Sequence, residues 1–93
     1  MARLGVTDNG SAFEFPCDVP VKVFGRNDDG FRRAVLQIVS TYFPDFGEAG
    51  LVERLSRQDR YLSMTLTVWV EDRSQIDNLY TELSAHEMVL MVL

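Results

Sequence analysis

The chain has 93 residues, of which 46% are apolar and 25% charged, and nine Lys and Arg against fourteen Asp and Glu give a net charge of -5. This length fits one domain with a single core, and the composition is that of a folded domain rather than a disordered segment. The negative charge disfavours nucleic-acid binding, because neutralising phosphates requires a basic surface. We find neither the apolar core of a signal peptide nor an apolar run near the ~20 residues of a membrane span, so we expect a cytoplasmic protein without membrane contact.

The sequence offers little material for catalysis or metal binding. Cys17 and His86 are the single cysteine and the single histidine, so an internal disulfide and a multi-cysteine metal cluster are excluded. The two could in principle supply a nucleophile and a base, but no third group is identifiable to orient the histidine. The carboxylates are spread over different predicted elements and match no metal-ligand spacing. We therefore expect no catalytic residue, no metal site and no cofactor.

The chain begins with little periodicity, and we predict a flexible arm over residues 1–12 followed by a single domain over residues 13–93. A strand is expected early in this domain, because three valines alternate with other residues and therefore share one face. The valines are Val19, Val21 and Val23, and the opposite face carries Pro20, Lys22 and Phe24.

A helix is expected after this strand, because apolar residues then recur at steps of three and four. Asp28 or Asp29 can cap its N-terminus by accepting backbone N–H bonds. Phe43-Pro44 ends it, since the residue before proline is pushed out of helical geometry. The apolar positions are Phe31, Ala34, Val35, Ile38, Val39 and Tyr42.

Two further strands are expected on either side of a tight hairpin at Gln58-Asp59. The run "LVERLSRQ" alternates Leu51 and Leu55 with charged and polar residues, as an edge strand does. The run "RYLSMTLTVWV" alternates more strictly, which predicts a strand with one buried face. That face holds Leu62, Met64, Leu66, Val68 and Val70, and the other holds Tyr61, Ser63, Thr65, Thr67 and Trp69.

A second helix and a last strand complete the pattern. Asp72 or Ser74 caps the helix, and "MVLMVL" predicts a strand in the interior of a sheet or against a partner, because it is apolar on both faces. The element order predicts an α+β fold: a ferredoxin-like βαββαβ sandwich with a four-stranded antiparallel sheet and two helices on one face. Crossover handedness places the first and third strands at the centre, the fourth beside the first and the second at the other edge. The apolar stripe of the second helix is Ile76, Leu79, Tyr80 and Leu83.

The sheet face away from the helices is left uncovered in this arrangement. It would carry Phe24, Trp69 and one alternating set of the last strand, and because these strands are neighbours we expect one exposed apolar patch. The patch could serve self-association or a protein partner, or it could be the scattered exposure common on monomers. An RNA-recognition module has the same element order, but "RYLSMTLTVWV" lacks its basic, glycine and aromatic signature. The candidate interaction residues are Phe24, Trp69, Met91 and Leu93.

The residues also resemble a known family. "FPCDVPVKVFGR", "RYLSMTLTVWVEDRSQIDNLYTELSAH" and the terminal "MVL" are similar, with the same relative spacing, to the bacterial YbeD-like family of small domains of unknown function, which have an ACT-like ferredoxin fold. The similar stretches run from Phe15 to Leu93. The resemblance implies a non-enzymatic domain similar to the amino-acid-binding regulatory modules of metabolic enzymes, and a connection with lipoate metabolism. It supplies no catalytic residues.

The loop "GRNDDG" is the candidate ligand site. ACT domains resemble this sequence in placing an Asp and a Gly at the strand-to-helix turn, where backbone N–H groups can meet a carboxylate, and the nearby arginine could also bind an acid group. Alternatively, an aspartate satisfies the same N–H groups as a helix cap. Two functions stay open: a regulatory small-metabolite-binding module completed by a second subunit, or a protein-interaction domain. The candidate ligand-binding residues are Gly25, Arg26, Asn27, Asp28, Asp29 and Gly30.

Overall fold

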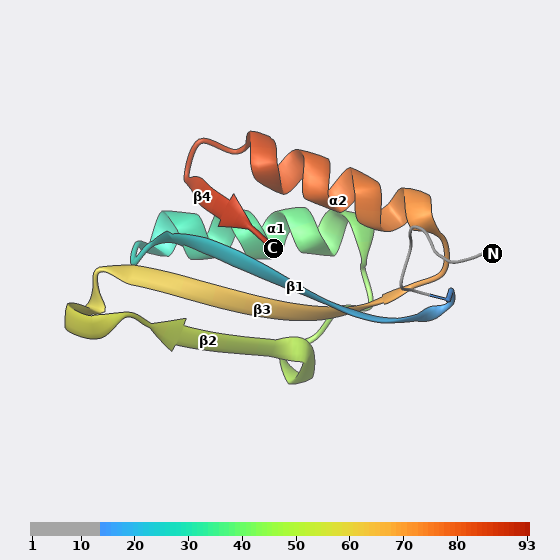
Figure 1. The fold of residues 1–93 in the computed structure, drawn as a ribbon, viewed down its shortest axis with the longest axis horizontal. Coiled ribbons are helices and arrows are strands. Elements are labelled where there is room, and N and C mark those ends of the chain that lie inside the picture. The colour runs from blue at the N-terminus through green and yellow to red at the C-terminus, as the bar shows by residue number, and fades with distance from the viewer. Residues whose placement is uncertain (1–13) are drawn as a thin grey trace.

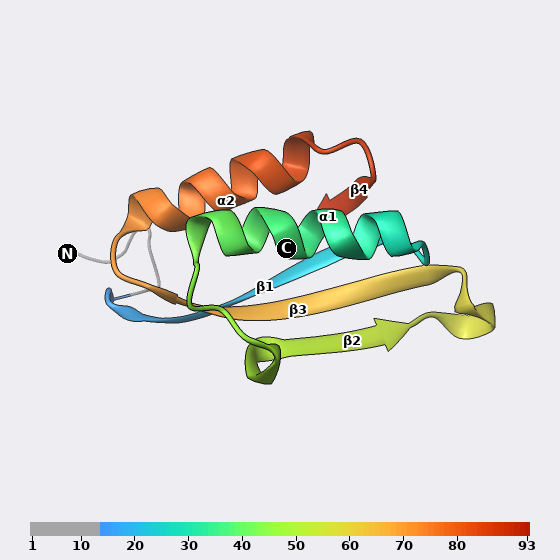
Figure 2. The same ribbon diagram turned by 180° about the vertical axis from the view of Figure 1, so that it is seen from behind.

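A computed structural model describes residues 14–93, and the predicted arm over residues 1–12 lies outside the described residues. The element order confirms the predicted βαββαβ sequence, and both helices lie on one side of the sheet (Figure 1; Figure 2 gives the view from behind). The elements are β1 (Cys17–Arg26), α1 (Asp29–Tyr42), β2 (Leu51–Leu55), β3 (Tyr61–Val70), α2 (Arg73–Ala85) and β4 (Val89–Val92), with single 3-10 turns at Glu48–Gly50 and Arg57–Asp59.

The strand order is β2-β3-β1-β4 with antiparallel pairing throughout, as predicted. The central strands β1 and β3 pair along their whole length, from Cys17 opposite Val70 to Arg26 opposite Tyr61. The last strand is not in the interior of the sheet: β4 pairs with β1 alone and is an edge strand, with a register shift between Phe24 and Gly25. Its two apolar faces have different surroundings: Val89 and Val92 pack against the core, whereas Leu90 and Met91 remain exposed.

The core lies between the helices and one face of the sheet. The predicted inner residues of the first and third strands are all buried there, and no polar or charged residue within 14–93 is buried. The helices contribute narrower stripes than their sequences indicate, since Ala34, Tyr42 and Tyr80 are only half-buried. Burial of this apolar surface is the main force that holds the helices on the sheet. The helical part of the core comprises Phe31, Val35, Ile38, Val39, Ile76, Leu79 and Leu83.

Each helix begins at one of the two caps that the sequence offered. Asp28 caps α1, because its carboxylate accepts a 2.6 Å hydrogen bond from the Gly30 N–H. Asp72 caps α2 by accepting from the Ser74 N–H at 2.9 Å, and the Gln75 side chain completes a capping box. The Ser74 hydroxyl also donates to Asp72, and this bond, with those from the backbone, lowers the pKa of the Asp72 carboxyl.

The predicted tight hairpin at Gln58-Asp59 is wrong in its length. The connection between β2 and β3 covers residues 56–60 and contains a 3-10 turn, in which Gln58 and Asp59 have φ angles of 69° and 58°. Ser56 closes the turn, because its N–H donates to the Tyr61 carbonyl at 2.9 Å and its hydroxyl accepts from the Tyr61 N–H at 2.9 Å. Hydrogen bonds of Ser56 therefore close this connection, in place of the two-residue turn that the sequence predicted.

Candidate functional site

The two glycines of the loop 25–30 differ in how closely other side chains approach them. A Cβ on Gly25 would lie 2.4 Å from Cε1 of Phe31, and one on Gly30 would lie 2.9 Å from Oδ1 of Asp28 and 3.2 Å from Cε of Met88. Neither glycine is needed for a left-handed backbone, since the loop contains no residue with positive φ. The rigid Phe31 ring thus explains Gly25, whereas the atoms near Gly30 are the ends of flexible side chains.

Asn27 and Asp28 in the same loop have hydrogen-bond partners within the chain. The Asn27 backbone N–H donates to the Arg60 carbonyl at 2.9 Å, and its side-chain amide donates to the Asp59 carbonyl at 3.0 Å. Asp28 accepts from the Gly30 N–H, and the Arg26 guanidinium lies 5.9 Å from the centre of the Tyr61 ring. These contacts favour the helix-cap interpretation over the ligand-site interpretation, and Asp29 adds a negative charge to the first turn of α1.

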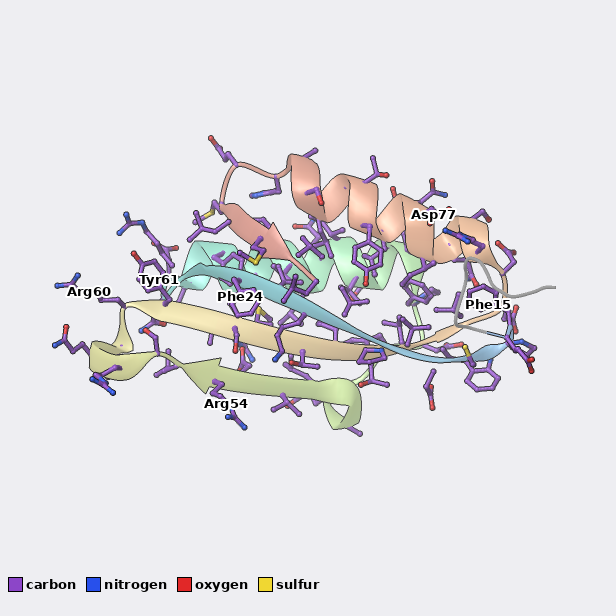
Figure 3. The ribbon with its side chains drawn as sticks, viewed as in Figure 1. Phe15, Phe24, Arg54, Arg60, Tyr61 and Asp77 are labelled. Atoms are coloured by element: carbon purple, nitrogen blue, oxygen red, sulfur yellow. The ribbon has the colours of Figure 1, made fainter. Side chains whose placement is uncertain are left out.

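The open face of the sheet brings together side chains from all four strands. Directly paired residues of antiparallel strands point to the same face, so the pairing defines two adjacent rows across the sheet. We call these two sets the open-face rows. The first row is Arg54, Ser63, Phe24 and Met91, and the second row is Val52, Thr65, Lys22 and Leu93. Figure 3 shows Phe24, Arg54, Tyr61 and Arg60 toward the β2–β3 turn end of the sheet, with Phe15 at the opposite end.

The predicted single apolar patch is divided into two. Phe24 and Met91 are direct partners, and Leu93 pairs through backbone hydrogen bonds with Lys22. Trp69, however, lies opposite Asp18, at the other end of β1 from Phe24. At about 3.3 Å per residue along a strand, this places the two aromatic residues roughly 20 Å apart. Residues on adjacent strands can lie far apart along the strand direction. The antiparallel register of β1 and β3 separates Phe24 from Trp69 in this way.

The open face is basic in the open-face rows and at the adjoining Arg26, although the protein is acidic. Lys22, Arg26 and Arg54 project from this face, and the Lys22 ammonium lies 6.0 Å from the centre of the Phe24 ring. The ion pairs within residues 14–93 are elsewhere: Arg32 with Glu53 at 2.5 Å on the helix side, and Arg73 with Asp77 at 3.6 Å on α2. Hydrogen bonding to Glu53 raises the pKa of Arg32. The three cations of the open face are therefore left to solvent or to a partner.

Two concave regions lie away from the loop 25–30, and the second includes Trp69 of the predicted interaction surface. A groove of 380 Å³ runs between the helices and is lined by Ile38, Glu82 and His86 among others. The second, which we call the Trp69 cavity, measures 460 Å³ and lies under the connection from α1 to β2. The sequence contains one signal for it, the aromatic and glycine residues of "PDFGEAG", but their position beside Trp69 depends on how distant segments pack. Its aromatic lining is Tyr42, Phe43, Phe46 and Trp69, and its carboxylates are Asp18, Asp45 and Glu71.

Glu82 and Tyr42 join the two helices between these regions. The Tyr42 hydroxyl donates a 2.5 Å hydrogen bond to a Glu82 carboxylate oxygen, and this bond raises the pKa of the Tyr42 phenol. The Tyr80 hydroxyl donates to the Leu93 carbonyl at 3.3 Å, and partial burial raises its pKa. The hydrogen bond of Tyr42 links α1 to α2, and that of Tyr80 links α2 to Leu93. Both phenols therefore have a structural role.

Cys17 and His86 lie on different elements of the fold. Cys17 is half-buried at the start of β1, whereas the His86 ring nitrogen Nδ1 accepts from the Met88 N–H at 3.1 Å beyond the end of α2. Across residues 14–93 no three His, Cys, Asp or Glu side chains are grouped as metal ligands would be. None of the helices in this part of the chain is long and apolar enough to cross a membrane.

The fold and the sequence both have known relatives. The crystal structure of the ACT domain from the GTP pyrophosphokinase of Chlorobium tepidum matches with a TM-score of 0.61 and 17% identity, covering 82% of this chain and 94% of that one. This likeness concerns the fold alone. A UPF0250 protein of Nitrosomonas europaea is 47% identical over 83 residues, which are 89% of this chain and 95% of the relative.

The similarity extends along the whole chain. A UPF0250 protein of Janthinobacterium sp. is 41% identical over 93 residues, the full length of both proteins. The sequence model of a family described as "Protein of unknown function (DUF493)" matches residues 11–93. These matches confirm the resemblance to YbeD-like proteins that the sequence motifs indicated. The chain therefore belongs to the DUF493 family, whose UPF0250 members have no established function, and it has the ACT-like ferredoxin fold.

Proposed function

We propose that this chain is a non-enzymatic interaction domain that binds a protein partner through the open face of its sheet. The observation that carries the proposal is the apolar part of the open-face rows. Phe24, Met91 and Leu93 are contiguous there, and Met91 and Leu93 are 53% and 63% exposed. Contiguous exposed apolar residues with a polar surround are typical of contact surfaces.

A regulatory role through a small metabolite at the loop 25–30 has less support. The groups that an amino acid would need there already have partners, since Asp28 accepts from Gly30 and the Asn27 side chain is bonded to the Asp59 carbonyl. Both cavities lie elsewhere. The connection with lipoate metabolism comes from the family resemblance, and no contact of these residues favours it.

Site-specific photo-crosslinking in bacterial cells tests the proposed surface. A photoreactive amino acid at Met91 should yield a discrete crosslinked protein, whereas the same group at Asn78, which is exposed on α2, should not. Phe24→Ser should abolish the crosslink from Met91 without changing the far-UV circular dichroism spectrum. Crosslinks that form only from Asn78, or a Met91 product that survives Phe24→Ser, would show that the open face is not the docking surface.

The Trp69 cavity supports a second candidate function, the binding of a small cationic molecule. Aromatic faces attract ammonium groups, and the carboxylates of Asp18, Asp45 and Glu71 attract cations while repelling carboxylate ligands. Among the described residues that line the cavity, none is basic. The expected ligand class is therefore an alkylamine, which differs from the acids expected at the loop 25–30.

Thermal unfolding with matched ligands tests this candidate. Cadaverine should raise the melting temperature by mass action, whereas valerate, which has a similar carbon chain and the opposite charge, should not. Trp69→Ala should remove the shift caused by cadaverine. Equal shifts with both ligands, or a shift that persists in Trp69→Ala, would exclude the cavity as a cation site.

A further inference from the structure

The charges of the open-face rows indicate the chemistry of the occupant. We infer that the open face receives an extended acidic segment of a partner protein, in which carboxylate and apolar side chains alternate along the face that meets the sheet. This inference rests on the proposed docking function and adds the chemical class of the partner. Three observations carry it: the placement of the basic residues, the interleaving of charged and apolar side chains, and the position of cations over the aromatic rings.

The basic residues are concentrated at one end of the sheet. Five of the nine Lys and Arg residues are Lys22, Arg26 and Arg54 on the open face and Arg57 and Arg60 in the adjoining turn. Complementary charge of this kind steers a partner and selects against partners of the wrong sign. Carboxylates also occur near this end, since Asp59 lies in the turn and Asp28 and Asp29 follow Asn27, which is bonded to it. On the open-face positions of the strands within residues 14–93, however, the acidic residue is Asp18, at the far end of β1.

The spacing of the first row suits an extended segment that crosses the strands. Arg54, Phe24 and Met91 stand on β2, β1 and β4, and neighbouring strands are about 4.8 Å apart, so the row spans roughly 14 Å. An extended chain of about five residues covers that distance at roughly 3.3 Å per residue. A carboxylate at one end would meet Arg54 while an apolar side chain packs on Phe24 and Met91.

The second row adds charge beside the apolar residues. Lys22 stands next to Leu93 in this row and lies 6.0 Å from the centre of the Phe24 ring. A segment that placed every side chain of one face on apolar surface would leave Lys22 desolvated without a partner, which is costly. A carboxylate two residues along the segment from the apolar side chain points to the same face and satisfies Lys22, so alternation of the two types along that face matches the rows.

The same cations argue against nucleic acid as the occupant. Single-stranded nucleic acid binds sheets by stacking its bases on exposed aromatic faces. Here the Lys22 ammonium lies over Phe24 at 6.0 Å and the Arg26 guanidinium over Tyr61 at 5.9 Å, so both rings already have a cation on one face. A carboxylate can bind these cations where they lie, whereas base stacking would have to displace them.

A synthetic peptide that repeats Glu-Ser-Val-Ser, so that Glu and Val share one face when it is extended, is a direct probe of this inference. A peptide with Lys in place of each Glu is its matched control. In an NMR titration, the acidic peptide should shift the amide signals of the open-face rows, and its affinity should fall as salt is raised. Arg54→Glu should weaken it about tenfold, which corresponds to about 1.4 kcal/mol. Arg33→Glu makes the same charge change on α1, where Arg33 is exposed, and should leave the affinity nearly unchanged.

The outcomes separate this inference from the function on which it rests. Equal binding of the Lys peptide and the Glu peptide, or equal effects of Arg54→Glu and Arg33→Glu, would overturn the acidic partner but leave docking through Phe24 and Met91 intact. If neither peptide binds but Met91 still forms a crosslink in cells, the acidic partner is likewise overturned and docking through the open face is kept. Tighter binding of oligo-uridine than of the Glu peptide at the same amides would identify nucleic acid as the occupant. A dimer in light scattering that is lost in Phe24→Ser would identify a second copy of the chain, and either result would overturn the inference.

Discussion

Replacement of Gly25 by alanine should destabilise the domain strongly, although it adds a single methyl group. The new Cβ would lie 2.4, 2.5 and 2.7 Å from three ring carbons of Phe31, whereas carbon atoms pack at about 3.5–4.0 Å. The ring must therefore move by about 1 Å, and Phe31 is fully buried. Overpacking of this kind costs about 1–3 kcal/mol, and we expect a value near the upper end because the contact involves the rigid ring rather than a flexible chain end.

Urea unfolding followed by circular dichroism measures this loss, and the melting temperature should fall by about 10–20 °C. Gly47→Ala is the matched control, because a Cβ there meets no atom within 4 Å, and it should change the free energy of unfolding by less than about 0.5 kcal/mol. In a Phe31→Leu background the added cost of Gly25→Ala should shrink by about 1 kcal/mol or more. The reasoning is refuted if Gly25→Ala and Gly47→Ala unfold alike, or if the cost of Gly25→Ala is unchanged beside Leu at position 31.

Three further predictions concern the caps and the helix pair. Asp28→Ala should lower the free energy of unfolding by about 1 kcal/mol, and Asp29→Ala by less, since only Asp28 accepts from the Gly30 N–H; urea midpoints in the reverse order would contradict this cap. The pKa of Asp72 is lowered in the folded state, so its stabilising contribution is complete above the unfolded value of about 3.9 and is lost as the pH falls through the folded value. Acid unfolding of wild type and Asp72→Asn should therefore diverge at high pH and converge at low pH, and parallel curves would contradict the assignment. The bond to Glu82 raises the pKa of Tyr42. Glu82→Gln should therefore move the titration of one phenol, followed by absorbance, to lower pH. An unchanged titration would show that the bond does not raise this pKa.

The parts of the fold that depend on local patterns were predictable. Alternation along Val19 to Val23 and along Leu62 to Val70 specifies which face is buried, because successive side chains of a strand point to opposite sides. Local chemistry of the same kind limited the N-cap of α1 to Asp28 or Asp29 and the N-cap of α2 to Asp72 or Ser74. Selection between the two required the geometry of the first helical turn, which residue type alone does not determine.

The candidate site was less predictable, because it depends on alignment between distant segments. The rows of the open face follow from the offset between β1 and β3, and these strands are separated in sequence by a helix and another strand. Alternation specifies the face that Phe24 and Trp69 share, but it does not give their separation along the sheet. The grouping of Lys22 with Arg54 was missed for the same reason, since each residue alone is an ordinary charged position on a strand.

The hydrogen bonds of Asn27 connect two turns that belong to different layers of the molecule. Its backbone N–H and side-chain amide hold the carbonyls of Arg60 and Asp59, so the turn before β3 is fastened to the residue that precedes the cap of α1. Local opening in proteins occurs in cooperative units joined by such bonds. A segment bound near Arg57 and Arg60 would restrain this unit, and amide hydrogen exchange in the first turn of α1 would slow on the side of the sheet that the segment never touches.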